Sequence, residues 1–206
     1  ISNAKQMKYF EDAKARFCFL EAEICAELGN MDRSIDKCDE CISLETEQDF
    51  FSDARFMRIN LALAKNDFES ALQHAEQFIE KGARDSYYYA ALYFRPFCLS
   101  KLGKEEAAEK YYKEAISLYR MATLQNLEVF DAYLYRAMCL KEIRQYEEAL
   151  KLLEFIENMS NQIAEVHTIR ADVYKLTGKE GLAKEELEKA FQLKPELKAV
   201  YSEGGE

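Results

Sequence analysis

Proline and glycine are scarce in this chain, which has two prolines and seven glycines among 206 residues. A sheet-rich domain needs many turns, so the shortage argues against a many-stranded sandwich and favours long helices joined by short links. Blocks of Lys and Arg are also absent, and the formal net charge is −10. Because a surface that binds phosphate groups must be basic, we expect neither nucleic acid nor an anionic membrane as a partner.

Catalytic motifs are equally scarce. The only histidines, His74 and His167, are far apart and have no Ser or Cys partner at a recognisable spacing. There is no Gly-rich phosphate loop and no paired helix-borne His motif. No apolar run approaches the length of a membrane span, and the N-terminal residues lack the order of a signal peptide. The sequence therefore predicts a cytoplasmic protein with no cofactor, no metal and no catalytic residues.

A helical pattern recurs along the chain. Four copies carry an arginine at the same place, and each arginine is followed in the next helix by an alanine. The arginines are Arg58, Arg95, Arg136 and Arg170, and the alanines are Ala71, Ala108, Ala149 and Ala183. A more divergent copy precedes them, with Ala22 and Ser34 at matching places, and from Ser34 onward the small residues are 37, 37, 41 and 34 residues apart. A period of this length indicates a solenoid of helix pairs.

The most regular copy, 164–197, resembles the tetratricopeptide repeat family. The residues that carry the resemblance are Ala171, Tyr174, Gly178, Ala183, Leu187, Ala190 and Pro195. It implies an all-α superhelix of about five antiparallel helix pairs, formed as a single array over 1–206. The repeats are expected at 15–51, 52–88, 89–129, 130–163 and 164–197, with 1–14 extending the first helix and 198–206 starting a capping segment or tail.

Apolar residues at helical spacing place the helices of this array. They are expected at 5–28, 31–45, 48–65, 67–82, 85–102, 104–123, 127–143, 145–158, 162–177 and 179–193. Gly or Asn stands at four of the five turns within pairs, whereas the fourth pair turns at Arg144-Gln145. Pro96 removes a hydrogen bond inside its helix, so a kink is expected there. The spacings of 37 and 41 residues are longer than the usual repeat. They predict second helices that extend beyond the array, as at 117–127.

The resemblance also implies a concave surface lined by the first helix of each pair. The positions that line this surface in the middle three copies hold apolar or aromatic residues, with one exception, an asparagine. We therefore predict a surface that binds a peptide or helix of a partner protein through Phe56, Met57, Asn60, Tyr93, Phe94, Phe97, Leu134, Tyr135 and Met138. The acidic composition favours a partner with Lys or Arg beside its apolar anchors. The alternatives are that neighbouring helices bury these residues or that residues 5–14, which extend the first helix, cover them.

Other family features are missing or have a structural explanation. Relatives that hold a chaperone's C-terminal tail need a clamp of Lys, Asn and Arg, of which only Asn60 is present, so we do not expect that partner. The four repeated arginines are expected to pack their stems between helices and to pair with carboxylates. Cys18, Cys25, Cys38 and Cys41 fall on core places, and two sulfurs seven residues apart on one helix are about 10 Å apart, too far for one zinc ion.

The functional prediction is a protein-interaction scaffold. The main alternative is a structural or self-association module of a longer protein, in which the same surface or an open end either forms a homo-oligomer or packs on other domains. An enzyme or a metal-binding regulatory domain is a distant alternative. Removal of Phe94 and Tyr135 is expected to abolish partner binding while leaving the melting temperature nearly unchanged.

Overall fold

The computed structural model describes residues 2–45, 51–82, 86–126, 129–160 and 162–203. These residues form helices and no strand. The chain divides into two compact units, 1–108 and 109–206, each of which is described here by itself. The expected positions 48–50, 85 and 127 lie outside the described residues.

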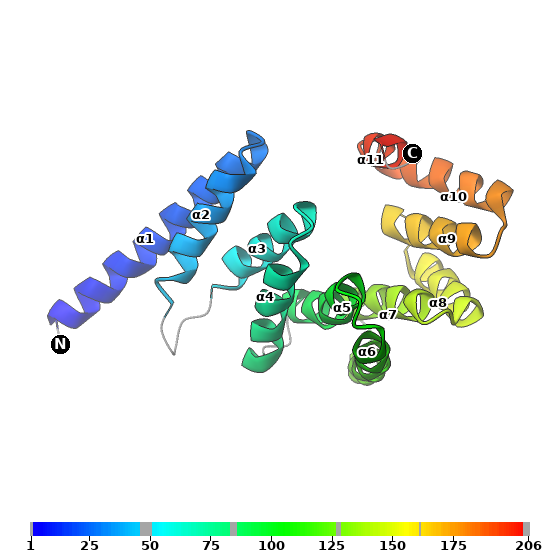
Figure 1. Cartoon of the computed structure of the whole chain (residues 1–206), viewed down its shortest axis with the longest axis horizontal. Helices are drawn as coiled ribbons and strands as arrows, with labels where there is room; N and C mark the ends of the chain where they lie inside the picture. Colours follow the sequence, from blue (N-terminus) through cyan, green and yellow to red (C-terminus); the bar gives the residue numbers. More distant parts are fainter. Residues whose placement is uncertain (1, 46–50, 83–85, 127–128, 161, 204–206) are drawn as a thin grey trace. The chain divides into compact units, whose positions relative to one another are not determined.

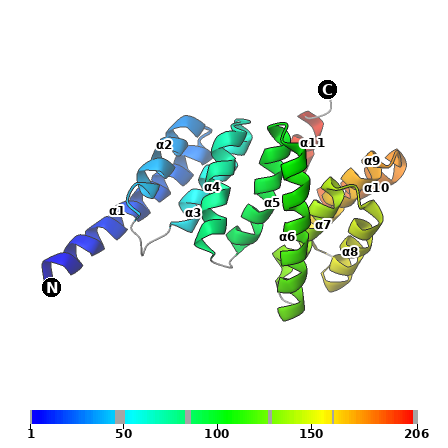
Figure 2. The same ribbon diagram turned by 60° about the horizontal axis from the view of Figure 1, so that its bottom comes forward.

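The first unit contains two antiparallel helix pairs and a fifth helix (Figure 1). The helices are α1 (Ser2–Glu27), α2 (Met31–Ile42), α3 (Ser52–Ala64), α4 (Phe68–Lys81) and α5 (Ser86–Lys101). Each of α1 and α3 packs against the helix that follows it, α3 also packs against α2, and α5 packs against α4 (Figure 2). The helix α5 continues through the buried Pro96.

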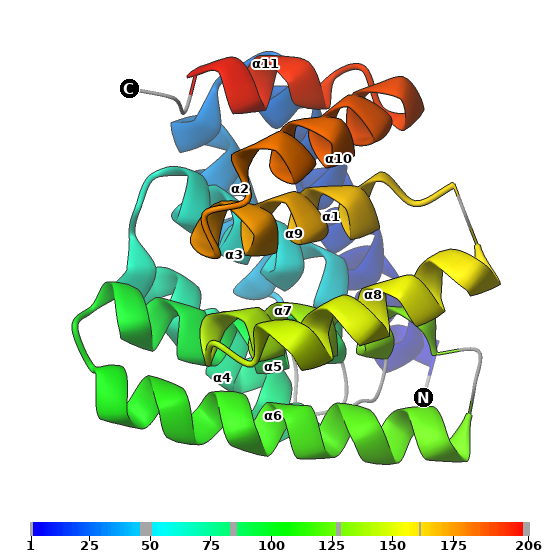
Figure 3. The same ribbon diagram turned by 90° about the vertical axis from the view of Figure 1, so that its right-hand side faces the viewer.

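Helix α6 (Glu105–Gln125) begins in the first unit and continues into the second. The second unit adds α7 (Phe130–Glu142), α8 (Tyr146–Met159), α9 (Ala164–Leu176), α10 (Glu180–Leu193) and α11 (Leu197–Glu203). Here α7 packs on α8 and α9 on α10, while α9 also contacts α7 and α8. Figure 3 shows α9, α10 and α11 in succession, with α11 packed on α10.

The ten predicted helices are therefore confirmed to within a few residues, and the short α11 lies in the segment expected to cap the array or form a tail. The turns within pairs follow the predicted chemistry, because Gly29, Asn66, Gly103 and Gly178 all have positive φ angles. The fourth pair makes the same turn with Arg144 at φ 62°, a conformation that is unfavourable for a side chain with a Cβ.

The extended second helices are confirmed at one place only. Helix α6 has 21 residues, against 14 each in α4 and α8. The prediction is wrong for α2 and α4, which end at Ile42 and Lys81. Gly82 adopts a left-handed conformation with φ 71° and ends α4.

Small residues are buried where the helices pack. Ala108, Ala149 and Ala183 are at most 1% exposed, as predicted. Ala149 packs in a core cluster with Leu140 and Val173. The four cysteines of the first pair are also buried in the core, where they act as small apolar side chains. Burial raises the pKa of the Cys38 thiol to about 12, so that thiol stays protonated and unreactive at neutral pH.

Candidate functional site

An aromatic cluster lies between α3 and α5 of the first unit. The ring centroids of Phe56 and Phe94 are 6.3 Å apart, and Tyr93 contacts both Phe94 and Phe97 with centroids at 5.7 Å. Tyr87, near the start of α5, is 4.6 Å from Phe56 by the same measure. The structure therefore brings together four of the residues that the sequence assigned to the concave surface.

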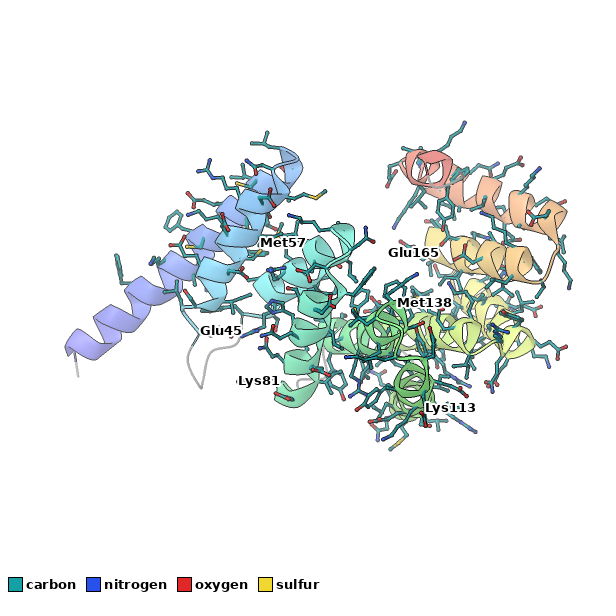
Figure 4. The ribbon with its side chains drawn as sticks, in the orientation of Figure 1. Glu45, Met57, Lys81, Lys113, Met138 and Glu165 are labelled. Carbon is teal, nitrogen blue, oxygen red and sulfur yellow. The ribbon has the colours of Figure 1, made fainter. Side chains whose placement is uncertain are left out.

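Burial differs among the six predicted site residues of this unit. Tyr93 is buried, Asn60 is exposed, and Phe56, Met57, Phe94 and Phe97 are half-buried. The three phenylalanines pack against a core cluster that includes Ile59, Phe78 and Cys98. Met57, labelled in Figure 4, packs beside Ala22 and Cys38. These side chains therefore form the edge of the core and remain partly accessible.

A cavity of about 440 Å³ adjoins the first pair, where α1 meets the beginning of α3. Its lining consists of Ala15, Arg16, Phe19, Cys41, Phe51, Ser52, Asp53 and Ala54. Arg16 and Phe19 hold the same repeat places in α1 as Asp53 and Phe56 hold in α3, 37 residues later. The site residues predicted from the sequence come only from the middle three copies and so do not include Arg16 and Phe19. Applying the same register to the first copy would have found them.

A carboxylate near this cavity fixes the start of α3. Glu45, labelled in Figure 4, accepts a hydrogen bond from the backbone N–H of Phe51 at 2.8 Å. The same carboxylate is bound by the Arg55 guanidinium, with Nε at 2.9 Å and 3.0 Å from its two oxygens. A carboxylate at this position satisfies a free amide and opposes the positive end of the helix dipole.

The remaining predicted site residues belong to the second unit. Leu134 and Met138 are half-buried and pack against a core cluster that includes Tyr133 and Ile169 (Figure 4). The ring of Tyr135 stacks on Tyr119 of α6 with centroids 6.4 Å apart. Burial raises the pKa of Tyr135 to about 12, and the charge of Asp131 acts in the same direction. That these three residues form one surface with the predicted site residues of the first unit stays a prediction.

Three of the four repeated arginines pair with carboxylates, as predicted. Nε of Arg58 lies 3.0 Å from a carboxylate oxygen of Asp39, and Nη2 of Arg136 lies 3.1 Å from one of Glu148. Nη2 of Arg170 lies 2.6 Å from one of Glu157. Each pair joins neighbouring helices, within one repeat for Arg136 and between successive repeats for Arg58 and Arg170, so these guanidinium groups are part of the helix packing.

Within the described residues, no helix is long and apolar enough to cross a membrane, and no group of His, Cys, Asp or Glu side chains is arranged to hold a metal ion.

The tetratricopeptide repeat model matches residues 91–120 and 164–197. No curated protein sequence matches the chain significantly. Among solved structures, a thermophilic tetratricopeptide-repeat protein of Thermus thermophilus, TTC0263, has a TM-score of 0.73 and 16% identity over 92% of this chain and 97% of that chain. A MamA RS-1 double mutant has a TM-score of 0.54 and 14% identity over 90% and 97%. At these identities the likeness concerns the fold. The family model thus matches two of the repeats, and the fold of the chain is that of tetratricopeptide-repeat proteins.

Proposed function

We propose that the chain is a non-catalytic scaffold that binds a peptide or helix of a partner protein along the first helices of its repeats. The observation that carries the proposal is the aromatic cluster of Phe56, Phe94 and Phe97, whose rings come from two helices and are only half-buried. Asn60, one turn after Phe56 on α3, adds an exposed amide that can donate and accept hydrogen bonds. Accessible aromatic area beside a polar group suits recognition of an amphipathic peptide.

The charges around this surface favour a basic partner. The chain has a net charge of −10, and the exposed Asp53 lies both at the cavity of the first pair and beside Tyr87, whose hydroxyl is 2.6 Å from its carboxylate. A ligand with Lys or Arg next to Leu, Phe or Met would satisfy both the apolar rings and the acidic field. Leu134, Tyr135 and Met138 are proposed as a second contact area for the same class of ligand.

The packing of the rings determines which substitution tests the proposal. Phe94 contacts the core as well as the surface, so replacing it would lower stability together with any binding. This differs from the expectation of a nearly unchanged melting temperature. Asn60 is exposed on α3 and has no such role in the core. An Asn60→Arg substitution therefore places bulk and positive charge on the surface while leaving the core intact.

Panning a displayed library of random peptides on the purified chain tests the proposal. We expect enrichment of peptides that combine apolar anchors with Lys or Arg, and about tenfold or greater loss of their affinity in Asn60→Arg. The control is Gln73→Arg, which makes the same charge change at an exposed position of α4 and should leave affinity unchanged. Failure to enrich any peptide, or equal loss in both variants, contradicts the proposal.

A further inference from the structure

Helix α1 has two apolar faces, of which only one is covered by the residues that the structure describes. Ala15, Cys18, Ala22 and Cys25 form the face that packs in the core of the first pair. A second stripe follows the spacing of helix turns around the opposite side. Its exposed fractions are 71% for Phe10, 69% for Phe17, 50% for Leu20 and 47% for Ile24, and Leu28, one residue after the end of α1, is 78% exposed. Five large apolar side chains in one exposed row indicate an interaction surface rather than chance exposure.

The later repeats show what kind of structure covers the equivalent face of their first helices. Ala54 and Leu61 hold the same repeat places in α3 as Phe17 and Ile24 hold in α1, 37 residues earlier. Ala54 is 1% exposed and packs with Cys41, while Leu61 is 7% exposed and packs with Cys38. Both cysteines belong to the preceding pair. The face that carries Phe17 and Ile24 is therefore a helix-packing face of the repeat.

The second unit repeats this relationship. Val166 and Val173 hold the corresponding places in α9, and both are at most 1% exposed. Val166 packs in a cluster with Tyr133 and Ala137 of α7, and Val173 packs with Leu140 of α7. In both units, then, this face of a first helix is covered by another helix of the same architecture.

The charges beside the stripe make α1 complementary to a second α1. On one flank, Arg16 and Glu23 are both exposed and seven residues apart. When two such helices pack antiparallel, like flanks face each other, so Arg16 of one copy lies opposite Glu23 of the other. The two-fold symmetry of such a contact makes this pairing occur twice.

The other flank has the same order of charges, with Lys14 before Glu21. These two residues are also bound within the first pair, because Lys14 lies 3.6 Å from Glu40 and Glu21 lies 2.7 Å from Lys37. In a parallel pair of helices, the flank with Arg16 and Glu23 would instead face the other flank of the second copy. Of these two residues, only Arg16 would then face a residue of opposite charge. The charge pattern therefore favours the antiparallel arrangement.

We propose that the chain forms a two-fold homodimer in which the exposed stripe of α1 packs antiparallel on the α1 of a second copy, with the axis near Leu20. The apolar row supplies the buried surface, and the pairs of Arg16 with Glu23 select the direction of the helices. The surface lies on a different face of the repeat from the aromatic cluster of α3 and α5. The dimer and the proposed binding of peptides can therefore succeed or fail separately.

Analytical ultracentrifugation of the full chain tests the interface. We expect the wild type to be a dimer at about 50 µM and the Phe17→Glu/Ile24→Glu variant to be a monomer with an unchanged helical circular dichroism spectrum. The control is Leu124→Glu, which changes an equally prominent apolar residue of α6, 77% exposed, and should remain dimeric. A monomeric wild type overturns the proposal, as does a dimer that survives the double substitution.

Charge reversal tests the antiparallel direction without touching the apolar row. Arg16→Glu and Glu23→Arg should each weaken self-association by about tenfold or more, because each places like charges opposite one another twice. An equimolar mixture of the two variants should form a heterodimer, since the first chain is then acidic and the second basic along this flank. Single variants that dimerise as well as the wild type, or a mixture that forms no heterodimer, overturn the proposed arrangement.

Discussion

His167 of α9 and Glu186 of α10 are joined by a contact of 2.7 Å between the ring Nδ1 and a carboxylate oxygen, and both side chains are less than a tenth exposed. The same oxygen accepts from Nη1 of Arg170 at 3.1 Å. Nη2 of Arg170 reaches Glu157 of α8 at 2.6 Å. One buried polar cluster thus connects three successive helices, and the Glu186 carboxylate contacts both the His167 ring and the Arg170 guanidinium.

Replacing Glu186 with Gln should destabilise the second unit. Burial alone would raise the pKa of Glu186, but hydrogen bonds from His167 and Lys189 and the charge of Arg170 outweigh it and lower that pKa. Removing the carboxylate leaves Arg170 with one buried acidic partner fewer, at a cost of about 3 kcal/mol. Urea denaturation at pH 7 measures this loss.

The pH dependence of the Glu186→Gln effect has a definite sign. Because the folded pKa is below the unfolded value of about 4.3, the stabilisation is complete above that pH and is lost as pH falls through the folded pKa. The difference between wild type and variant should therefore shrink below about pH 4. Glu188→Gln, at an exposed position of the same helix, is the control and should have little effect at either pH.

His74 should make stability fall over a different pH range. Burial lowers the pKa of His74 to about 4, and the charges of Arg58 and Arg55 act in the same direction. The unfolded histidine binds a proton near pH 6.5, so the contribution of the neutral folded ring is complete above that pH and is lost as pH falls toward 4. Thermal melts of wild type and His74→Gln between pH 7.5 and 5 test this. The variant should lose less stability on acidification, and parallel curves would disprove the assignment.

Arg144→Gly should stabilise the chain. Arg144 is held at φ 62° in the turn between α7 and α8, where a residue with a Cβ is strained and glycine is not. We expect a gain of about 1 kcal/mol in the free energy of unfolding, measured by denaturant titration. Arg144→Ala retains the Cβ and should show no such gain. A gain of the same size in the alanine variant would show that the arginine side chain, not the backbone, is responsible.

Ala149→Leu should destabilise the second unit by about 1–3 kcal/mol, because Ala149 is 0% exposed and the larger side chain must displace Leu140 or Val173. The denaturation midpoint measures the effect. Lys151→Leu, two residues later at an exposed position of α8, provides a matched control that should be nearly neutral. An unchanged midpoint in Ala149→Leu would mean that the contact between α7 and α8 is looser than the structure shows.

The helices and their pairing were predictable from the sequence because they depend on local, repeated features. The small residues Ala108, Ala149 and Ala183 recur where helices must approach closely, and Gly29, Gly103 and Gly178 recur where one helix ends. The cysteines of the first pair were assigned to the core for the same reason. Every copy of a repeat has to satisfy these requirements, so the pattern can be recognised from the sequence alone.

The polar clusters and the accessibility of each face were decided only by the tertiary structure. His167 and Glu186 are 19 residues apart, and nothing in the spacing of two such residues shows that neighbouring helices turn them toward each other. Phe17 and Leu61 are both apolar residues at helical spacing, yet one is 69% exposed and the other 7%. Whether an apolar face is core or interface depends on whether another helix lies against it, and that is a property of the packed arrangement rather than of the local pattern.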